Sequence, residues 1–566
     1  MEEKVLKNLK IRFTYELDEK INKLVVSENY SCKDFAICIN KSDLTLGEKL
    51  NVKILPNRDI KVKDFSISYK MNFTNKSKVF VNGYESWTDS REFSVDEKLT
   101  NISKMVPKTI LKKYGLYQYG DYNFKKYSDK KGVFHGFTYG YVRNGEIFNL
   151  VGSLSEKSGF TILNYDINQN KVVIEKECKE LIIKKDYTVF DLVFLIGKEN
   201  DVFDKYFGEM KIDKPKVKPM TGYTSWYHHY QNISEDILLE NLESISSLNK
   251  DIDIFQIDDG YQTAVGDWLS IDKNKFPNGM KIIADKTKEK GMIPGIWLAP
   301  FACEINSEIT RQHPDWILKN NDGSFVTGGS NWGGFYALDF CNVEVQKYLE
   351  KVFNEIINVW GFEMVKLDFL YATCIVPREG KTRGQIMCEA MDFLRKCVGN
   401  KLILGCGVPL GAAFGKVDFC RIGCDIGLDW NDKWYMRFLH RERVSTQNAL
   451  INTIGRRHLD GRAFLNDPDV FLLRDENIML TDEQKQTLAL LNHLFGSLLF
   501  TSDDVKKYTE DQMRVFNKTI EKSEIEILSV EQNSNLITSI NYKENGVKYT
   551  VKVNLKTGSS RVIKRS

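Results

Sequence analysis

The chain has 566 residues with an ordinary globular composition, 42% hydrophobic and 28% charged. This length leaves room for about three or four domains of ~150 residues each. Its 80 Lys and Arg against 77 Asp and Glu give a net charge of +3, which excludes the broad basic field of a nucleic-acid-binding protein. No apolar run approaches the ~18 residues of a membrane span, and the acidic start MEEKVLKNLKIRF is unlike a secretory signal.

The eleven cysteines are scattered without a CxxC pair, which favours reduced thiols. We therefore expect a cytoplasmic protein without membrane or nucleic-acid partners, either a monomer or a homo-oligomer. The sequence has no glycine-rich phosphate loop, and we expect no cofactor. We expect no metal either. The adjacent His228 and His229 would face opposite sides of a strand, and Asp467 and Asp469 of a DPD motif are more simply turn residues.

The N-terminal part of the chain, residues 1–212, is expected to form a β-sandwich. Segments such as KVVIEKECKELIIKKDYTVFDLVFL, residues 171–195, alternate or run apolar and are rich in strand-forming residues. A single long helix pattern is hard to find there. The polar stretch DKPKVKP, residues 213–219, contains two prolines and predicts a domain boundary.

Residues 213–523 are expected to form a (β/α)8 barrel, because strand-like and helical patterns alternate eight times. The predicted strands are Gly222–Tyr227, Ile252–Ile257, Ile293–Ala299, Met364–Phe369, Leu402–Cys406, Phe419–Gly423, Ala463–Leu465 and Ser497–Thr501. Among the helices between them, Val343–Trp360 has apolar residues every three or four positions and Gly361 to end it, and Ser234 is placed to cap another. A doubly wound sheet is the competing fold, since it alternates in the same way.

The last segment, residues 524–566, returns to alternating strands such as LITSINY and VKYTVKVNL. We expect a small C-terminal β domain. The predicted fold class is therefore a (β/α)8 TIM barrel flanked by an N-terminal β-sandwich and a C-terminal β domain.

Chemically active side chains gather at the C-terminal ends of the predicted barrel strands, where barrel enzymes place their active sites. They are Asp258, Asp259, Trp297, Lys366, Asp368, Cys406, Arg421 and Asp425. A single Asp at a strand end is more often a helix cap or a turn residue. Several such strand ends together are harder to explain in that way. Two carboxylates with aromatic platforms are what cleavage of a glycosidic bond needs.

The same motifs resemble glycoside hydrolase family 36, and in particular its compact bacterial α-galactosidases. The resemblance runs in order through residues 220–475, in the motifs GYTSWYHHYQNISED, IFQIDDGYQTAVGDWL, FPNGMKIIADKTKEKGMIPGIWLAPF, VKLDFLYA, ILGCGVPLGAAFGKVDFCRIGCD and FLNDPDVFLLR. The N-terminal VNGYESWTDS also resembles the loop by which the family's sandwich domain sends a Trp, here Trp87, into the active site.

The resemblance implies catalytic roles for two aspartates. The KLD motif makes Asp368 the nucleophile, and the R-x-x-x-D pattern of Arg421 and Asp425 makes Asp425 the acid/base. Asp418 and Asp429 are the rivals for the second role. The resemblance further implies substrate-binding roles for Asp258 and Asp259 at the 4- and 6-hydroxyls, Lys366 at the 3- and 4-hydroxyls and Arg421 at the 2-hydroxyl, with Trp297 and Trp87 as walls. Trp226 and Cys406 are candidate lining residues because they stand at strand ends, and a buried, inert thiol is an equal alternative for Cys406.

Simple physical chemistry agrees with this division of labour. Lys366 lies two residues before Asp368, so both point to the same side of a strand, and the cation should keep Asp368 ionised. Asp425 must hold a proton at rest and should carry the higher pKa, with Asp368 about 5 to 5.5 Å away. We expect a retaining exo-α-galactosidase acting on small galactosides of the raffinose and melibiose type.

Two departures from the family pattern leave the substrate open. Val408 stands where a small polar or Gly residue is expected, and the run from Cys424 to Asp429 is unusual. We expect the loops that carry them to border the 2-position and the leaving-group side. An α-N-acetylgalactosaminidase and a galactosyl-transferring transglycosidase are therefore alternatives on the same scaffold. A catalytically silent sugar-binding protein is a third, against which the presence of both Asp368 and Asp425 argues.

Overall fold

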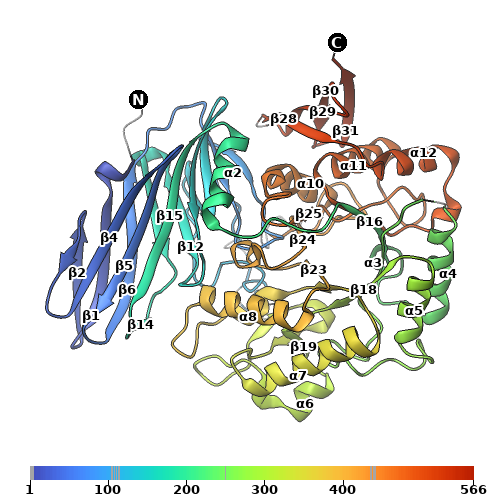
Figure 1. The fold of residues 1–566 in the computed structure, drawn as a ribbon, viewed down its shortest axis with the longest axis horizontal. Coiled ribbons are helices and arrows are strands. Elements are labelled where there is room, and N and C mark those ends of the chain that lie inside the picture. Colours follow the sequence, from blue (N-terminus) through green and yellow to red (C-terminus); the bar gives the residue numbers. More distant parts are fainter. Residues whose placement is uncertain are drawn as a thin grey trace.

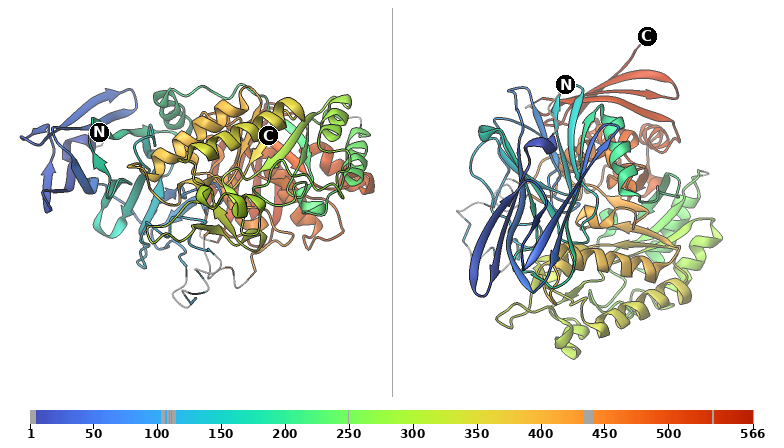
Figure 2. Two further views of the ribbon diagram at one scale, coloured as in Figure 1. Left: turned by 90° about the horizontal axis from the view of Figure 1, so that it is seen from below. Right: turned by 60° about the vertical axis from the view of Figure 1, so that its left-hand side comes forward.

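The computed structural model shows an N-terminal β-sandwich, a central barrel and a small C-terminal sheet in chain order (Figure 1). The structure describes residues 5–102, 106–107, 109, 111, 115–248, 250–433, 436, 441–533 and 535–565. The sandwich lies to one side of the barrel in every view (Figure 2). The predicted fold class is confirmed.

The sandwich consists of two antiparallel sheets that enclose their own apolar core. One sheet contains β2 (Lys20–Val26), β1 (Lys10–Leu17), β6 (Ile60–Lys70), β13 (Lys171–Lys176), β12 (Thr161–Asp166) and β9 (Val133–Phe137), with β14 (Ile182–Ile183) beside β6. The other contains β3 (Tyr30–Ser31), β4 (Phe35–Leu44), β5 (Gly47–Pro56), β15 (Tyr187–Gly197), β11 (Ile147–Ser153), β10 (Tyr139–Asn144), β7 (Lys78–Val81) and β8 (Arg91–Ser94). Alternate side chains such as Leu50, Val52 and Ile54 face the core and are fully buried, as the period-two pattern predicts.

One helix in this region was not expected from the sequence. α2 (Glu199–Met210) follows β15 and buries one apolar face made of Val202, Phe203, Tyr206 and Phe207. The helix ends at Lys211, which takes the left-handed conformation with φ of 57° although it is not a glycine. The usual glycine stop signal is therefore absent from the sequence, and this short helix is hidden among strand-like segments.

The central sheet is parallel throughout. Its strands, in spatial order, are β25 (Leu465–Asp467), β24 (Phe419–Arg421), β23 (Leu402–Gly405), β22 (Met364–Leu367), β18 (Ile293–Leu298), β17 (Ile254–Ile257), β16 (Met220–Thr224), β27 (Leu498–Thr501) and β26 (Val470–Phe471). Only Pro468 and Asp469 separate β25 from β26, so the two are halves of one strand. The sheet thus closes into an eight-stranded barrel, which excludes the open doubly wound sheet.

The first barrel strand is shorter than predicted. β16 ends at Thr224, and the next residues form the short helix α3 (Trp226–His229). His228 and His229 therefore lie side by side on a helical turn, with ring centroids 4.1 Å apart, and not on opposite faces of a strand. Among the residues that the structure describes, no group of His, Cys, Asp and Glu is arranged to hold a metal ion.

The remaining helices surround the barrel. They are α4 (Glu235–Ser246), α5 (Lys281–Glu289), α6 (Glu308–Gln312), α7 (Val343–Asn354), α8 (Arg383–Val398), α9 (Leu410–Ala413), α10 (Thr446–Gly455), α11 (Asp482–Phe495) and α12 (Glu510–Thr519). Ser234 caps α4 as predicted, because its hydroxyl accepts the N–H of Ile237. The helix predicted over 343–360 is regular only in α7 and continues as a π-helical turn over Glu355–Val359. None of the described helices is long and apolar enough to cross a membrane.

The C-terminal part is a four-stranded antiparallel meander of β28 (Ile525–Gln532), β29 (Ile537–Glu544), β30 (Val547–Asn554) and β31 (Ser559–Lys564). It lies over α11 (Figure 1). The indole N–H of Trp430 donates to the carbonyl of Leu555 at 2.8 Å, which joins this sheet to a loop of the barrel.

Candidate active site

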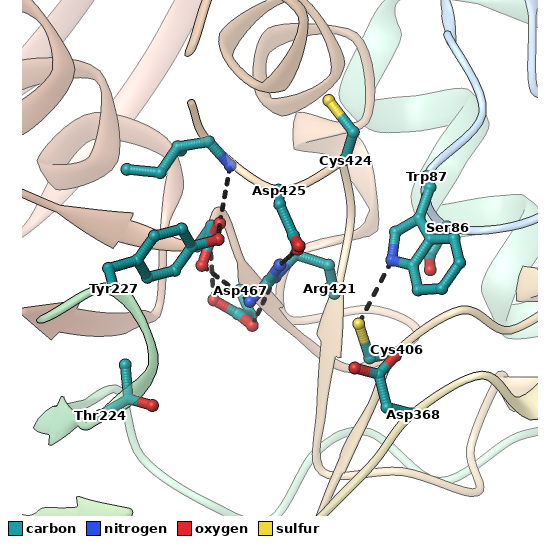
Figure 3. A network of polar contacts seen from close by, with 12 residues as sticks. Ser86, Trp87, Thr224, Tyr227, Asp368, Cys406, Arg421, Cys424, Asp425 and Asp467 are labelled. Carbon is teal, nitrogen blue, oxygen red and sulfur yellow. Dashed lines mark hydrogen bonds and ion pairs between the residues drawn. The ribbon is translucent and has the colours of Figure 1, made fainter. Parts of the chain in front are cut away.

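A pocket of about 360 Å³ opens where the barrel strands end, the usual position of an active site in this fold. Among the predicted site residues, Trp87, Trp226, Asp258, Asp259, Trp297, Lys366, Asp368 and Asp425 line it. Arg421 and Cys406 lie behind the lining and contact it, since Arg421 pairs with Asp425 and Cys406 accepts a hydrogen bond from Trp87 (Figure 3).

Asp368 follows directly after β22, and both of its carboxylate oxygens are held by donors. The indole N–H of Trp297, at the end of β18, donates to Oδ2 at 3.1 Å. The backbone N–H of Phe369 donates to Oδ1 at 2.9 Å. Phe369 has φ of 52°, an uncommon left-handed conformation for an aromatic residue, and this turn aims the neighbouring carboxylate into the pocket. Two neutral donors thus fix the orientation of the carboxylate.

Lys366 has a different partner from the one expected. Its ammonium donates to Asp258 Oδ2 at 2.8 Å, across the barrel interior from β22 to the end of β17. Burial is the largest single effect on the pKa of Lys366 and lowers it, but the acidic neighbours, first Asp258 and then Asp368, together raise that pKa above its usual value. Lys366 is therefore a permanent cation whose closest counter-ion is Asp258.

Asp259 is surrounded by side-chain donors. Its carboxylate accepts the amides of Gln231 at 2.8 Å and Gln262 at 2.5 Å, and the indole N–H of Trp332 at 2.8 Å. Burial raises the pKa of Asp259, and these three hydrogen bonds oppose that effect. The Asp258–Asp259 pair thus presents two fixed carboxylates to the pocket, one bound to a cation and one to neutral donors.

Asp425 lies in the loop after β24, and its side chain lines the pocket and is 43% exposed. Enclosure by the pocket walls raises the pKa of Asp425, and the nearby carboxylate of Asp368 raises it further. The cations Arg421 and Lys366 lower the same pKa. Arg421 Nη1 lies 2.7 Å from Asp425 Oδ1. Asp425 therefore has the raised proton affinity that a general acid needs.

The two carboxylates of the DPD motif are ligands of Arg421 and not simply turn residues. Asp467 Oδ2 lies 3.0 Å from Arg421 Nε (Figure 3). Asp469 Oδ1 lies 2.7 Å from Arg421 Nη2. Burial raises the pKa of Asp469 to about 7, while Arg421 opposes the shift.

The sandwich contributes Trp87 to the barrel of the same chain. The loop after β7 is held by the N–H of Ser86, which donates to Val408 O at 3.0 Å, and the Trp87 indole donates to Cys406 Sγ at 3.3 Å. Gly407 has φ of 56°, and a Cβ there would lie 2.9 Å from the Trp87 ring. Val408 is fully buried and does not line the pocket, so the expectation that it borders the substrate is wrong.

The rival acid/base candidates do not line the pocket. Asp418, at the other end of β24, pairs with Arg395 at 3.0 Å and accepts the N–H of Ile403. Asp429 pairs with Lys433.

Further lining residues were missed from the sequence, chiefly Tyr119 and Trp332. Trp332 belongs to the turn η4 (Asn331–Gly333) between β20 (Thr327–Gly329) and β21 (Phe335–Ala337), which pairs with β19 (Ala302–Glu304). The Tyr119 hydroxyl donates to Asn331 Oδ1 at 2.6 Å, so a segment of the sandwich domain positions this turn. Neither residue stands at a strand end, and the clustering of Trp and Gly in SNWGGF was the only available signal.

Known proteins resemble this chain in sequence and in fold. Residues 214–385 match the melibiase family. The chain is 26% identical to an α-galactosidase of Escherichia coli over 221 residues, 37% of this chain and 30% of that protein. It is 28% identical over 200 residues, 31% of this chain, to the A type blood α-D-galactosamine galactosaminidase of Flavonifractor plautii, of which the match spans 18%. The chain thus matches less than a third of these curated relatives' length.

A solved structure matches almost the whole chain. The α-galactosidase of Thermus thermophilus in complex with p-nitrophenyl α-D-galactopyranoside superimposes with a TM-score of 0.71 at 24% identity, covering 90% of this chain and 98% of that one. The same enzyme in complex with stachyose gives a TM-score of 0.69 at 25% identity, covering 85% and 99%.

The chain has the fold and the pocket position of the glycoside hydrolases that use a (β/α)8 barrel, and its family match points to the same class. Within that class it carries a melibiase domain on the fold of the family 36 α-galactosidases, and the resemblance predicted from the sequence is confirmed.

Proposed function

We propose that the protein is a retaining, exo-acting α-galactosidase that removes terminal α-linked galactose from short galactosides of the raffinose and melibiose type. The observation that carries the proposal is that the side chains of Asp368 and Asp425 line the same pocket, together with the Asp258–Lys366 pair. The melibiase match and the α-galactosidase relatives support the same activity.

In the proposed mechanism Asp368 attacks the anomeric carbon while Asp425 protonates the leaving oxygen. Trp297 and the N–H of Phe369 orient the attacking carboxylate. After the glycosyl ester forms on Asp368, Asp425 accepts a proton from water, which hydrolyses the ester with net retention. The raised pKa of Asp425 supports its role as the acid of the first step.

The walls of the pocket suggest how galactose would be recognised. The carboxylates of Asp258 and Asp259 and the ammonium of Lys366 offer charged partners for adjacent sugar hydroxyls. Trp87 and Trp297 provide apolar faces on either side of these groups. The solved complex of the Thermus thermophilus enzyme with stachyose supports a short galactoside as the substrate.

One relative supports an alternative, an α-N-acetylgalactosaminidase. The Flavonifractor plautii protein is named for a galactosamine substrate. Cys424, which belongs to the unusual run after Arg421, lines the pocket here. Its small side chain is compatible with a larger group at the sugar's 2-position.

Substrate choice can be tested by comparing hydrolysis of 4-nitrophenyl α-galactoside, its 2-acetamido analogue and the α-glucoside. We expect the unmodified galactoside to be preferred, with retention of the α configuration by proton NMR of the first product. Preference for the acetamido sugar would move the activity to the alternative, and cleavage of none would contradict both.

The nucleophile assignment has its own test. Asp368→Asn should reduce kcat by several orders of magnitude, since the step that forms the glycosyl ester is lost, while galactose binding by calorimetry persists. Asp418→Asn is the control, because that carboxylate lies outside the pocket and should leave kcat within a few-fold. Substantial turnover by Asp368→Asn would disprove the assignment.

We also propose that the enzyme acts in the cytoplasm. All eleven cysteines are unpaired, which supports a reducing compartment.

A further inference from the structure

The Asp467-Pro468-Asp469 segment is an unusual feature of the barrel. It interrupts the seventh strand between β25 and β26, and Asp469 has φ of 79°, a left-handed conformation that is strained for a residue other than glycine. The side chains of Asp467 and Asp469 are 0% and 1% exposed. Carboxylates are rarely buried so completely unless they are paired.

Their partner is a single guanidinium, that of Arg421. Its Nε pairs with Asp467, its Nη2 with Asp469 and its Nη1 with Asp425, at 3.0, 2.7 and 2.7 Å. One positive charge is thus shared among three carboxyl groups. Asp467 and Asp469 are buried in the protein, whereas Asp425 lines the pocket.

This arrangement resolves a conflict in the proposed mechanism. A general acid must carry a proton at rest, but an arginine 2.7 Å away favours the ionised carboxylate. The negative charges of Asp467 and Asp469, which bind Nε and Nη2 of the same guanidinium, offset that attraction. Removing that charge would leave the full cation facing Asp425.

We propose that Asp469, together with Asp467, is a positioning residue that neutralises Arg421 and so allows Asp425 to hold its catalytic proton. The proposal rests on the acid/base role of Asp425 in the proposed function. Asp469 acts through Arg421 and does not line the pocket itself.

Asp469 is itself held by two further donors. The Tyr227 hydroxyl, from α3, donates to its Oδ2, and the N–H of Ile426 donates to the same oxygen at 2.9 Å. Ile426 directly follows Asp425, so the buried carboxylate also fixes the backbone next to the proposed acid. Both contacts favour the ionised form of Asp469.

Other groups also act on Asp425 and enter the argument. The titratable and charged groups that face it are Arg421 on β24, Lys366 and Asp368 at the end of β22, Asp258 after β17, Tyr227 and Tyr230 at α3, Cys406 after β23, the adjacent Cys424, and Asp469. Of these, Asp469 is the carboxyl group that shares the guanidinium of Arg421 with Asp425 and is also bound by Tyr227.

The test is the pH profile of kcat/KM for 4-nitrophenyl α-galactoside. In Asp469→Asn the alkaline limb, where the acid loses its proton, should move to lower pH by about one unit, because the unbalanced Arg421 stabilises ionised Asp425. Tyr227→Phe should shift the limb in the same direction by less, since Asp469 then binds a proton more readily. Tyr227→Phe removes a single hydroxyl and keeps the test decisive if Asp469→Asn does not fold.

Asp503→Asn is the matched control. Asp503 is also fully buried and pairs with an arginine, Arg474, at 2.8 Å, but it does not line the pocket. It should lower stability and leave the alkaline limb in place. An unmoved limb in both Asp469→Asn and Tyr227→Phe would overturn the inference.

Asp425→Asn separates this inference from the proposed function. If Asp425 is the acid, that variant loses the alkaline limb altogether. Persistence of the limb in Asp425→Asn would refute the acid/base assignment and the inference with it. Loss of the limb there, combined with an unmoved limb in Asp469→Asn and Tyr227→Phe, would refute the inference alone.

Discussion

Single side chains at the bottom of the pocket are fixed by donors that come from distant parts of the sequence. Asp368 is oriented by Trp297, and Asp259 by Trp332, although 71 and 73 residues separate the members of these pairs. An indole N–H is a rigid donor, so it can hold a carboxylate in one orientation at little entropic cost. The site is therefore organised before the substrate arrives.

Replacement of Trp332 by Phe tests this organisation. Asp259 would keep Gln231 and Gln262 but lose its indole donor, so we expect KM for the galactoside to rise by up to roughly tenfold with a smaller change in kcat. Trp316→Phe is a suitable comparison, because Trp316 stacks on His313 outside the pocket. Equal KM values in the two variants would show that Trp332 does not position Asp259 for binding.

The sequence predicts the site residues that stand at strand ends, but not those that lie in irregular segments. Asp258, Lys366, Asp368 and Asp425 stand at strand ends, where a parallel barrel must bring them together. Trp332 and Tyr119 lie in irregular segments whose path no periodicity describes. The pairing of Lys366 with Asp258, in preference to Asp368 on its own strand, depends on the reach of the ammonium across the barrel interior to the end of β17, two strands away.

At the scale of elements, the turn after β23 packs closely against the sandwich loop that carries Trp87. Gly407 is the point of closest approach, with the Trp87 ring on one side and the N–H of Phe369 on the other. Its left-handed conformation and its missing side chain are both required there.

Gly407→Ala should therefore weaken catalysis more than stability. A Cβ 2.9 Å from the Trp87 ring must displace the indole from the pocket, and we expect kcat/KM to fall at least tenfold. The left-handed conformation alone costs about 1–2 kcal/mol, which thermal unfolding would report. Gly461→Ala carries a similar φ, 68° against 56°, with nothing within 4 Å of the new methyl group, and should affect stability alone. Comparable activity of the two variants would contradict the role given to the Trp87 loop.

At the scale of the whole molecule, the sandwich and the barrel are joined by a polar seam. Arg456, 0% exposed, donates to the carbonyls of Glu85 and Ser86 at the base of the Trp87 loop and to Ile422 O in the barrel. Next to it, His458 stacks on Phe203 of α2 with centroids 4.0 Å apart and bonds to the Tyr139 hydroxyl. The two domains are thus joined by buried contacts.

This seam should make stability depend on pH. Burial holds the pKa of His458 well below 6.5, with further lowering by the neighbouring arginines. The folded state therefore favours neutral His458, and its contribution to stability is complete above about pH 6.5 and is lost as the pH falls below that value.

His458→Gln should remove the dependence contributed by one proton. Between about pH 6.5 and 5.5 the fall in unfolding free energy should become shallower by about 1 kcal/mol per pH unit, measured by denaturant titration. His313→Gln, on the barrel surface next to Trp316, should leave the slope unchanged. Parallel slopes for wild type and His458→Gln would contradict a buried neutral His458.

The alternation of strands and helices, the flanking β domains and the strand-end carboxylates could be predicted from the sequence, because hydrophobic periodicity and chain order decide which strands exist and which ends meet. The tertiary structure decided which groups pair. α2 was not predicted because no glycine marks its end, and Val408 is buried in the structure. Asp467 and Asp469 bind Arg421 because the sixth and seventh strands of the barrel lie side by side. Such pairings depend on distances across the fold, which local pattern does not encode.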